Sequence, residues 1–273
     1  MSFKKVYFGT NLKMYKGVAD TVSYLKELEQ LTCDIDRNCA ELFVIPSYTA
    51  LSEAVCSVSQ AQILLGAQNM CWEEQGQFTG EISPLMLREL GLSIVELGHS
   101  ERRHIFGESN EMINRKVCTA LKNGFKTLLC IGETGEDKQY GISDEVLRIQ
   151  LKTGFYGVSD KMCGQIMVAY EPVWAIGADG KPASAEYAKE KHAVIRKTLC
   201  EIFGDNGYAI PLLYGGSVNP SNADNLILQP DIDGLFVGRS AWNAADFNSL
   251  IRSAIDNVLL LLIITLHNFP YLV

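Results

Sequence analysis

Short apolar runs alternate along the chain with longer segments of helical period, and a polar or glycine-bearing loop follows each run. Such short runs are typical of buried strands, and the longer segments are typical of helices. Eight strands are predicted: Val6–Thr10, Leu42–Ile45, Gln62–Gly66, Ser93–Leu97, Lys126–Cys130, Ile166–Tyr170, Ile210–Tyr214 and Gly234–Val237. The alternation predicts parallel βα units, because parallel strands need a crossover connection.

Eight βα units in about 250 residues have the size of a closed (β/α)₈ barrel. An open doubly wound sheet shows the same alternation, so periodicity alone does not exclude it. That fold favours a glycine-rich turn after its first strand, whereas this strand continues into Gly9–Lys13 with two polar side chains. We therefore predict an α/β fold consisting of a single (β/α)₈ barrel.

The barrel domain is expected to span residues 1–257, because no Pro-, Gly- or Ser-rich linker interrupts the alternation. Residues 258–273 form an apolar tail of unknown role that begins with the run Val258–Leu266. This run is shorter than the ~20 apolar residues of a spanning helix. An extension of the last helix, packed on the barrel, is therefore expected in preference to a membrane anchor.

Charge and cysteine usage narrow the classes of partner. The 273 residues carry a net charge of −8 without a clustered basic face, so neither nucleic acid nor a membrane surface is expected as a partner. The N-terminus lacks the apolar region of a signal peptide. The eight cysteines include no CxxC pair and no histidine at metal-ligand spacing. A cytoplasmic protein without a metal site is expected, and any anionic ligand has to be held locally.

Active sites of such barrels lie at the C-terminal ends of the strands. The residues that stand there in this sequence are Asn11, Lys13, His99, Ser100, Glu101, Glu171, Ser217 and Gly238. A carboxylate, an imidazole and an ammonium group in one barrel mouth indicate proton transfer.

Two of these residues are candidates for acid–base chemistry. Glu171 ends an apolar strand before Pro172, so its carboxylate is expected at the rim, where burial would make it a stronger base. His99 precedes Ser100, the expected N-cap of a helix with Glu101 in its first turn. A helix N-terminus disfavours protonation of a nearby imidazole. Alone, each residue fits a structural role, but their convergence favours a catalytic one.

Three glycine-bearing loops, around Gly177, Gly215–Ser217 and Gly238, follow the last strands. Singly, such glycines serve as turns. Together, loops after strands seven and eight beside a helix start form the usual phosphate site of barrels, where backbone N–H groups hold the anion.

Seven motifs are distributed between Val6 and about Asp256, namely Asn11–Met14, Gly66–Asn69, Phe78–Ser83, Gly98–Arg103, Cys130–Glu133, Ala169–Gly177 and Tyr214–Val218. In combination they resemble the triosephosphate isomerase family. The resemblance implies an isomerase of short sugar phosphates, with dihydroxyacetone phosphate and glyceraldehyde 3-phosphate as the main expectation. The reaction would proceed by enediolate proton transfer without a cofactor.

The resemblance also implies roles for the catalytic candidates. Glu171 would be the base and His99 the neutral electrophile that polarises the carbonyl. Lys13 would balance the phosphate and enediolate charge, and Asn11 would orient the substrate. Glu101 is grouped with these catalytic residues.

Other positions match the family's substrate and subunit contacts. Gly177, Ser217 and Gly238 match its phosphate-binding positions, and the adjacent Arg239 is grouped with these phosphate-binding residues. Residues 172–183 match the closing lid that keeps water from the enediolate. Thr79 matches a residue that reaches the neighbouring subunit, which implies a homodimer.

Three departures from the family's pattern border the expected substrate position. Leu12 replaces a Trp, the segment Ala175–Ala183 makes the lid one residue longer, and Arg239 replaces a second Gly. They resemble a branch that acts on erythrulose phosphates, so a four-carbon ketose phosphate is the alternative substrate. An alternative of another class is a barrel that binds phosphorylated metabolites without turnover, which would not need Glu171.

Overall fold

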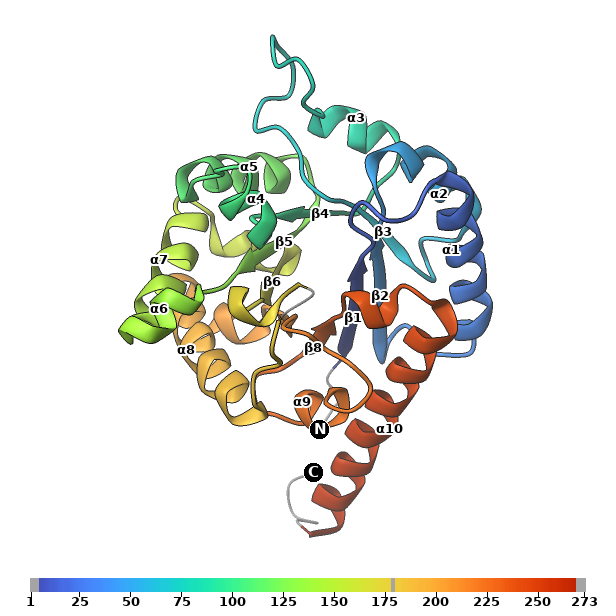
Figure 1. Ribbon diagram of the computed structural model, residues 1–273, viewed down its shortest axis with the longest axis vertical. Coiled ribbons are helices and arrows are strands. Elements are labelled where there is room, and N and C mark those ends of the chain that lie inside the picture. The colour runs from blue at the N-terminus through green and yellow to red at the C-terminus, as the bar shows by residue number, and fades with distance from the viewer. Residues whose placement is uncertain (1–4, 178–179, 269–273) are drawn as a thin grey trace.

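The fold is known from a computed structural model, which describes residues 5–177 and 180–268, with side chains described as far as Ile264. Eight parallel strands form a closed barrel in sequence order, and β1 pairs with β8 (Figure 1). The strands are β1 (Val6–Asn11), β2 (Ala40–Ile45), β3 (Leu64–Ala67), β4 (Ile94–Leu97), β5 (Lys126–Ile131), β6 (Ile166–Tyr170), β7 (Leu212–Tyr214) and β8 (Gly234–Phe236). The predicted (β/α)₈ barrel is confirmed, with strand ends shifted by at most two residues.

Helices surround the barrel between successive strands (Figure 1). They are α1 (Val18–Thr32), α2 (Leu51–Ser57), α3 (Pro84–Glu89), α4 (Ser100–His104), α5 (Asn110–Lys122), α6 (Gly135–Tyr140), α7 (Ser143–Gly154), α8 (Ala185–Phe203), α9 (Ala223–Ile227) and α10 (Ala244–Asn268). Short 3₁₀ helices are η1 (Tyr48–Ala50), η2 (Asp160–Gln165), η3 (Val173–Ala175), η4 (Gly204–Ala209) and η5 (Arg239–Ala241). Side-chain caps from Ser109 and Ser184 satisfy backbone N–H groups where α5 and α8 begin.

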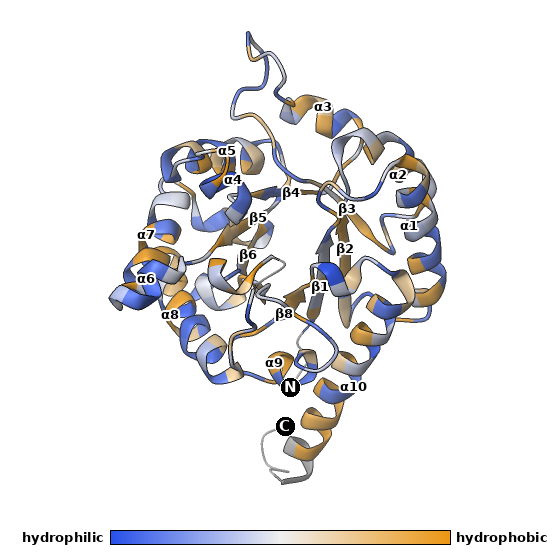
Figure 2. Ribbon diagram, viewed as in Figure 1, coloured by the Kyte–Doolittle hydropathy of each residue, from blue (hydrophilic) through white to orange (hydrophobic). Residues whose placement is uncertain are grey.

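Alternation of side chains along the strands divides the apolar core into two layers. The outer layer packs between the strands and the helices, and Figure 2 shows polar residues spread over the helices that cover it. A Cβ at Gly9 would overlap the Phe43 ring, so glycine is required where this ring fills the barrel. The inner layer contains Phe43, Ile45, Ile94, Leu128, Cys130, Met167, Ala169, Leu213 and Phe236.

The last helix, α10, has a packed part and a projecting part. Phe247 and Ile251 are buried beside the barrel, and Arg252 donates a 2.6 Å hydrogen bond to Asp34. Farther on, the helix projects past the barrel (Figure 1), and its side chains at Leu259, Leu260, Leu261, Ile263 and Ile264 are 40 to 54% exposed. The tail extends the last helix, but the expectation that it packs on the barrel is wrong for these residues.

By length and composition alone, the stretch Ala244–Ile264 is long and apolar enough to cross a membrane, with a mean hydropathy of 1.6. The first half of this stretch supplies the buried side chains that pack beside the barrel. Those residues are therefore part of the barrel's own core, whereas the projecting half is not.

Candidate active site

A cavity of about 370 Å³ opens at the C-terminal ends of the strands. Its volume is in the range of sites for small ligands. Its lining contains all the predicted catalytic and phosphate-binding residues, namely Asn11, Lys13, His99, Glu101, Glu171, Gly177, Ser217, Gly238 and Arg239. The fold thus brings together at one end of the barrel predicted site residues that are spread over most of the sequence.

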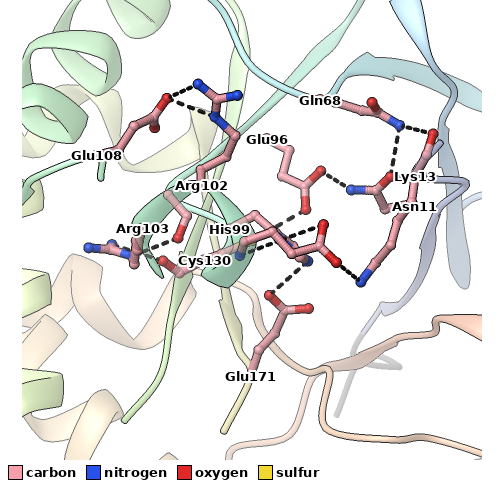
Figure 3. Close-up of polar contacts among 12 residues, drawn as sticks. Asn11, Lys13, Gln68, Glu96, His99, Arg102, Arg103, Glu108, Cys130 and Glu171 are labelled. Carbon is pink, nitrogen blue, oxygen red and sulfur yellow. Dashed lines mark hydrogen bonds and ion pairs between the residues drawn. The ribbon is translucent and has the colours of Figure 1, made fainter. Parts of the chain in front are cut away.

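His99 and Glu171 face each other inside this cavity (Figure 3). The backbone N–H of Glu101 donates to His99 Nδ1 at 3.2 Å, so Nδ1 is unprotonated and Nε2 carries the hydrogen of the neutral ring. His99 Nε2 lies 3.7 Å from Glu171 Oε2, a buried oxygen with no hydrogen-bond partner among the described residues. A buried carboxylate oxygen and an N–H donor therefore face one small space, as acid–base chemistry requires.

The start of α4 differs by one residue from the prediction. Ser100, the expected N-cap, is the first helical residue, and His99 is the N-cap. The imidazole takes the acceptor position that a serine hydroxyl usually fills, because its Nδ1 reaches the free N–H of Glu101. The cap fixes both the ring orientation and its tautomer.

Glycines on the neighbouring strand ends make room for Glu171. The backbone N–H of Glu171 donates to Ile131 at 2.8 Å, which ties the end of β6 to β5. A Cβ at Gly132 would overlap the carbonyl group of Glu171, and a Cβ at Gly215 would lie 2.8 Å from its Cγ. These two positions admit only glycine without displacing Glu171.

Lys13 supplies a fixed positive charge in the cavity. Its Nζ lies 2.7 Å from Glu101 Oε1. Burial lowers the pKa of Lys13, but the hydrogen bond and charge of Glu101 outweigh burial and leave this pKa raised. Burial raises the pKa of Glu101, but the hydrogen bond from Lys13 outweighs it and leaves this pKa lowered. Both groups are therefore charged at neutral pH.

Asn11 is held by three hydrogen bonds (Figure 3). Its Oδ1 accepts from the Lys13 backbone N–H at 2.7 Å and from Gln68 Nε2 at 3.0 Å. Its Nδ2 donates to Glu96 Oε2 at 2.6 Å. Sequence analysis assigned no role to Gln68 or Glu96. The signal for Glu96 was present, since it is a single carboxylate at an inward position of an otherwise apolar strand.

Arg103 anchors the helix that carries His99. It donates to the carbonyl oxygens of Gly98 at 2.6 Å and Cys130 at 3.0 Å, which joins α4 to β4 and β5 (Figure 3). Burial lowers the pKa of Arg103 to about 10, so it stays cationic at neutral pH. On the same helix, Arg102 donates to the buried Glu108 at 2.8 Å. His99 is therefore held by a rigid support.

The phosphate-binding candidates lie in the loops that follow β6, β7 and β8. Gly177 and Ser217 have φ angles of 92° and 52°. The Ser217 hydroxyl donates to the carbonyl of Ala175, which joins the loop after β7 to the segment that was predicted as the lid. Gly238 caps η5, and the exposed Arg239 adds a cation. Residues 178 and 179 of the predicted lid, Ala178 and Asp179, lie outside the described residues.

The cavity mouth also contains aromatic residues that sequence analysis did not identify. The rings of Tyr15 and Trp242 are 4.4 Å apart, and Trp242 Nε1 donates to the Asn11 carbonyl at 3.0 Å. Leu12, expected to border the substrate, instead packs in the outer apolar layer and is absent from the described cavity lining. That expectation is wrong, since Leu12 follows the end of β1 with a fully buried side chain.

Comparison with known proteins decides the family. The sequence model described as triosephosphate isomerase matches residues 6–254. The chain belongs to the triosephosphate isomerase family. A solved member, triosephosphate isomerase from Bartonella henselae, superposes with a TM-score of 0.82 at 33% identity, over 91% of this chain and 98% of that one.

Two curated proteins are more similar to this chain in sequence than that solved structure is. The L-erythrulose-1-phosphate isomerase of Rhizobium etli is 45% identical over 92% of this chain and 94% of its own length. The protein of the same name from Brucella abortus is 44% identical over 93% of this chain and 98% of its own length. The chain is therefore a sugar-phosphate isomerase, and the non-catalytic alternative is not supported.

Proposed function

We propose that the protein interconverts four-carbon ketose phosphates, with L-erythrulose 1-phosphate as its substrate. The observation that carries this proposal is the identity of 44 to 45% with relatives of that name, compared with 33% for the solved triosephosphate isomerase. This higher identity favours the alternative substrate, a four-carbon ketose phosphate, over the main expectation of a triose phosphate. The altered position Arg239 on the cavity wall is consistent with a changed substrate.

The proton transfer follows from the geometry of Glu171 and His99. In L-erythrulose 1-phosphate, C2 is the carbonyl and C3 carries a hydroxyl and a hydroxymethyl group. Glu171 removes the proton from C3, and the His99 Nε2–H donates to the carbonyl oxygen as negative charge develops there. The O3 proton passes to O2, and Glu171 returns its proton to C2. The carbonyl is then at C3, so C3 is oxidised and C2 is reduced within one molecule.

The other groups of the cavity stabilise charge. Lys13 lies where its ammonium group offsets the negative charge of the phosphate and the enediolate. The backbone N–H groups of Gly177, Ser217 and Gly238, which line the cavity, would hold the phosphate. The Tyr15 and Trp242 rings wall the mouth, where the added hydroxymethyl group would be accommodated.

The test follows L-erythrulose 1-phosphate in D₂O by NMR. The wild type should form the C3 ketone and incorporate deuterium at the carbon that receives the returned proton. Glu171→Gln should lower kcat by at least roughly a hundredfold with nearly unchanged phosphate affinity, as for loss of a general base. Absence of turnover by the wild type would contradict the four-carbon proposal.

We further propose a cytoplasmic homodimer in which the loop Gln68–Gly80 contacts the second subunit. This loop projects from the barrel (Figure 1), and its tip exposes Thr79 and 39% of Phe78. At its base, Gln68 donates to Asn11 and to the Lys13 carbonyl, so the loop is tied to the active site. Sedimentation at assay concentration should show a dimer, and an active monomer would contradict it.

A further inference from the structure

A carboxyl group lies inside the barrel directly beside the active site. Glu96, on β4, is fully buried and faces inward with Ile94 of the same strand. It forms no ion pair within the described part of the chain. A carboxylate in such surroundings is costly unless a cation or several hydrogen bonds compensate it.

The contacts of Glu96 are suited to a neutral acid. Its Oε2 accepts from Asn11 Nδ2 at 2.6 Å, and its Oε1 lies 3.6 Å from the Cys130 sulfur (Figure 3). Neither partner carries a positive charge. In the neutral acid, Oε2 is the carbonyl oxygen that accepts from Asn11, and Oε1 carries the proton and faces the Cys130 sulfur, a weak acceptor. Two such contacts do not replace the hydration of a negative charge.

Glu96 determines which end of the Asn11 amide faces it. The Asn11 oxygen is already held by two donors, the Lys13 backbone N–H and Gln68 Nε2. The amide nitrogen must then point to an acceptor, and Glu96 Oε2 is that acceptor. Only one hydrogen of Nδ2 is used in this way, so the other remains for the cavity that Asn11 lines.

Charged groups surround Glu96 on several elements. Lys13 follows β1, Glu101 lies on α4 and Glu171 follows β6, while the Cys130 thiol on β5 and the neutral His99 add no charge. Burial is the largest cause of a strongly raised pKa at Glu96, and the charge of Glu171 raises it further, against a lowering by Lys13. Burial likewise raises the pKa of the Cys130 thiol.

We propose that Glu96 is a positioning residue that remains an uncharged carboxylic acid at neutral pH. In this form it orients the Asn11 amide toward the substrate. It also leaves the barrel interior beneath Glu171 without a second negative charge. Ionisation of Glu96 at alkaline pH would place a negative charge beneath the developing enediolate and slow the reaction. The kinetic part of this inference deepens the proposed function, since it concerns the same site.

The first test needs no substrate. An infrared difference spectrum at neutral pH, wild type minus Glu96→Gln, should show the carbonyl band of a protonated carboxylic acid. Glu41→Gln is the matched control, because Glu41 is also at an inward strand position but pairs with Lys126 at 2.6 Å. Its difference spectrum should show carboxylate bands. Carboxylate bands for Glu96 would overturn the proposal.

The second test is a pH profile on whichever triose or tetrose phosphate the enzyme turns over. Glu96→Gln should keep kcat/KM within about threefold of wild type near neutral pH, and its alkaline limb should move to higher pH. Glu96→Ala should raise KM at least about tenfold, because the Asn11 amide loses its hydrogen-bond acceptor. Glu96→Gln supplies an acceptor oxygen and should keep KM near the wild-type value. A tenfold or larger loss in Glu96→Gln at neutral pH, or an unmoved alkaline limb, would overturn the proposal. Because the infrared test needs no substrate, its result does not depend on whether the four-carbon assignment is correct.

Discussion

Lys13 and Glu101 form an ion pair across the mouth of the barrel, with Nζ 2.7 Å from Oε1. The same Glu101 uses its backbone N–H to hold His99 Nδ1 at 3.2 Å. One residue thus orients both the ammonium group of Lys13 and the imidazole of His99. The ion pair also keeps Lys13 charged despite its partial burial, because the hydrogen bond to Glu101 offsets desolvation.

Removal of the cation should impair binding and chemistry together. Lys13→Ala is expected to lower kcat/KM by at least roughly a hundredfold, with changes in both KM and kcat, because the charge serves ground and transition states. Steady-state kinetics check this. The control is Lys122→Ala, an exposed lysine outside the cavity lining that pairs with Glu74 at 3.0 Å and should behave like wild type. Lys13→Ala kinetics within a factor of about two of wild type would exclude the assigned role.

A methyl group beside Glu171 should displace its carboxylate. In Gly215→Ala the new Cβ would lie 2.8 Å from Glu171 Cγ and 3.2 Å from its Oε1. A shift of about 1 Å is expected to cost up to about a hundredfold in kcat. Gly164→Ala is the matched control, because a Cβ there meets no atom within 4 Å. Equal kcat for the two folded variants would show that Glu171 tolerates the displacement.

A buried histidine outside the active site should make stability depend on pH. The His192 Nδ1–H donates to the Asp231 carbonyl at 3.0 Å, so Nε2 is unprotonated, and it has no hydrogen-bond partner among the described residues. Burial lowers the pKa of His192 from 6.5 to about 4. Between these pH values the unfolded state binds the proton and the folded state does not, so stability falls as the pH falls.

The expected slope is about 1.4 kcal/mol of unfolding free energy per pH unit within that window. Urea titrations of wild type and His192→Gln at several pH values measure it, because the variant keeps an N–H donor for Asp231 but does not titrate. Above about pH 6.5, the difference in unfolding free energy between the two proteins should no longer change with pH. A difference that is constant through the window would contradict the assignment.

The apolar extension of α10 should be dispensable for catalysis. Deletion of residues 258–273 removes the exposed side chains of Leu259, Leu260, Leu261, Ile263 and Ile264, and none of the residues that line the described cavity. We expect kcat and KM within about twofold of wild type and higher solubility, since a large exposed apolar surface favours association. Kinetics and light scattering check this, and a large loss of kcat in a folded, truncated protein would assign the tail a role in the site.

Local patterning was sufficient to predict the barrel and the gathering of its catalytic candidates. Strand period and crossover helices place the C-terminal strand ends at one mouth, so Glu171 and His99 were expected at the same mouth once eight βα units were recognised. The tautomer of His99, the inward position of Glu96 and the absence of Leu12 from the cavity depend on side-chain directions and long-range contacts. Pattern alone does not determine these features.

The most direct test of the account is the ratio of kcat/KM for L-erythrulose 1-phosphate to that for glyceraldehyde 3-phosphate, measured on the same preparation of wild-type protein. One added hydroxymethyl group is worth only about 1–3 kcal/mol unless its hydroxyl is specifically bound, so some triose activity is compatible with the account. The account predicts a clear preference for the four-carbon substrate, of roughly tenfold or more. A preference of about a hundredfold or more for the triose phosphate would contradict it.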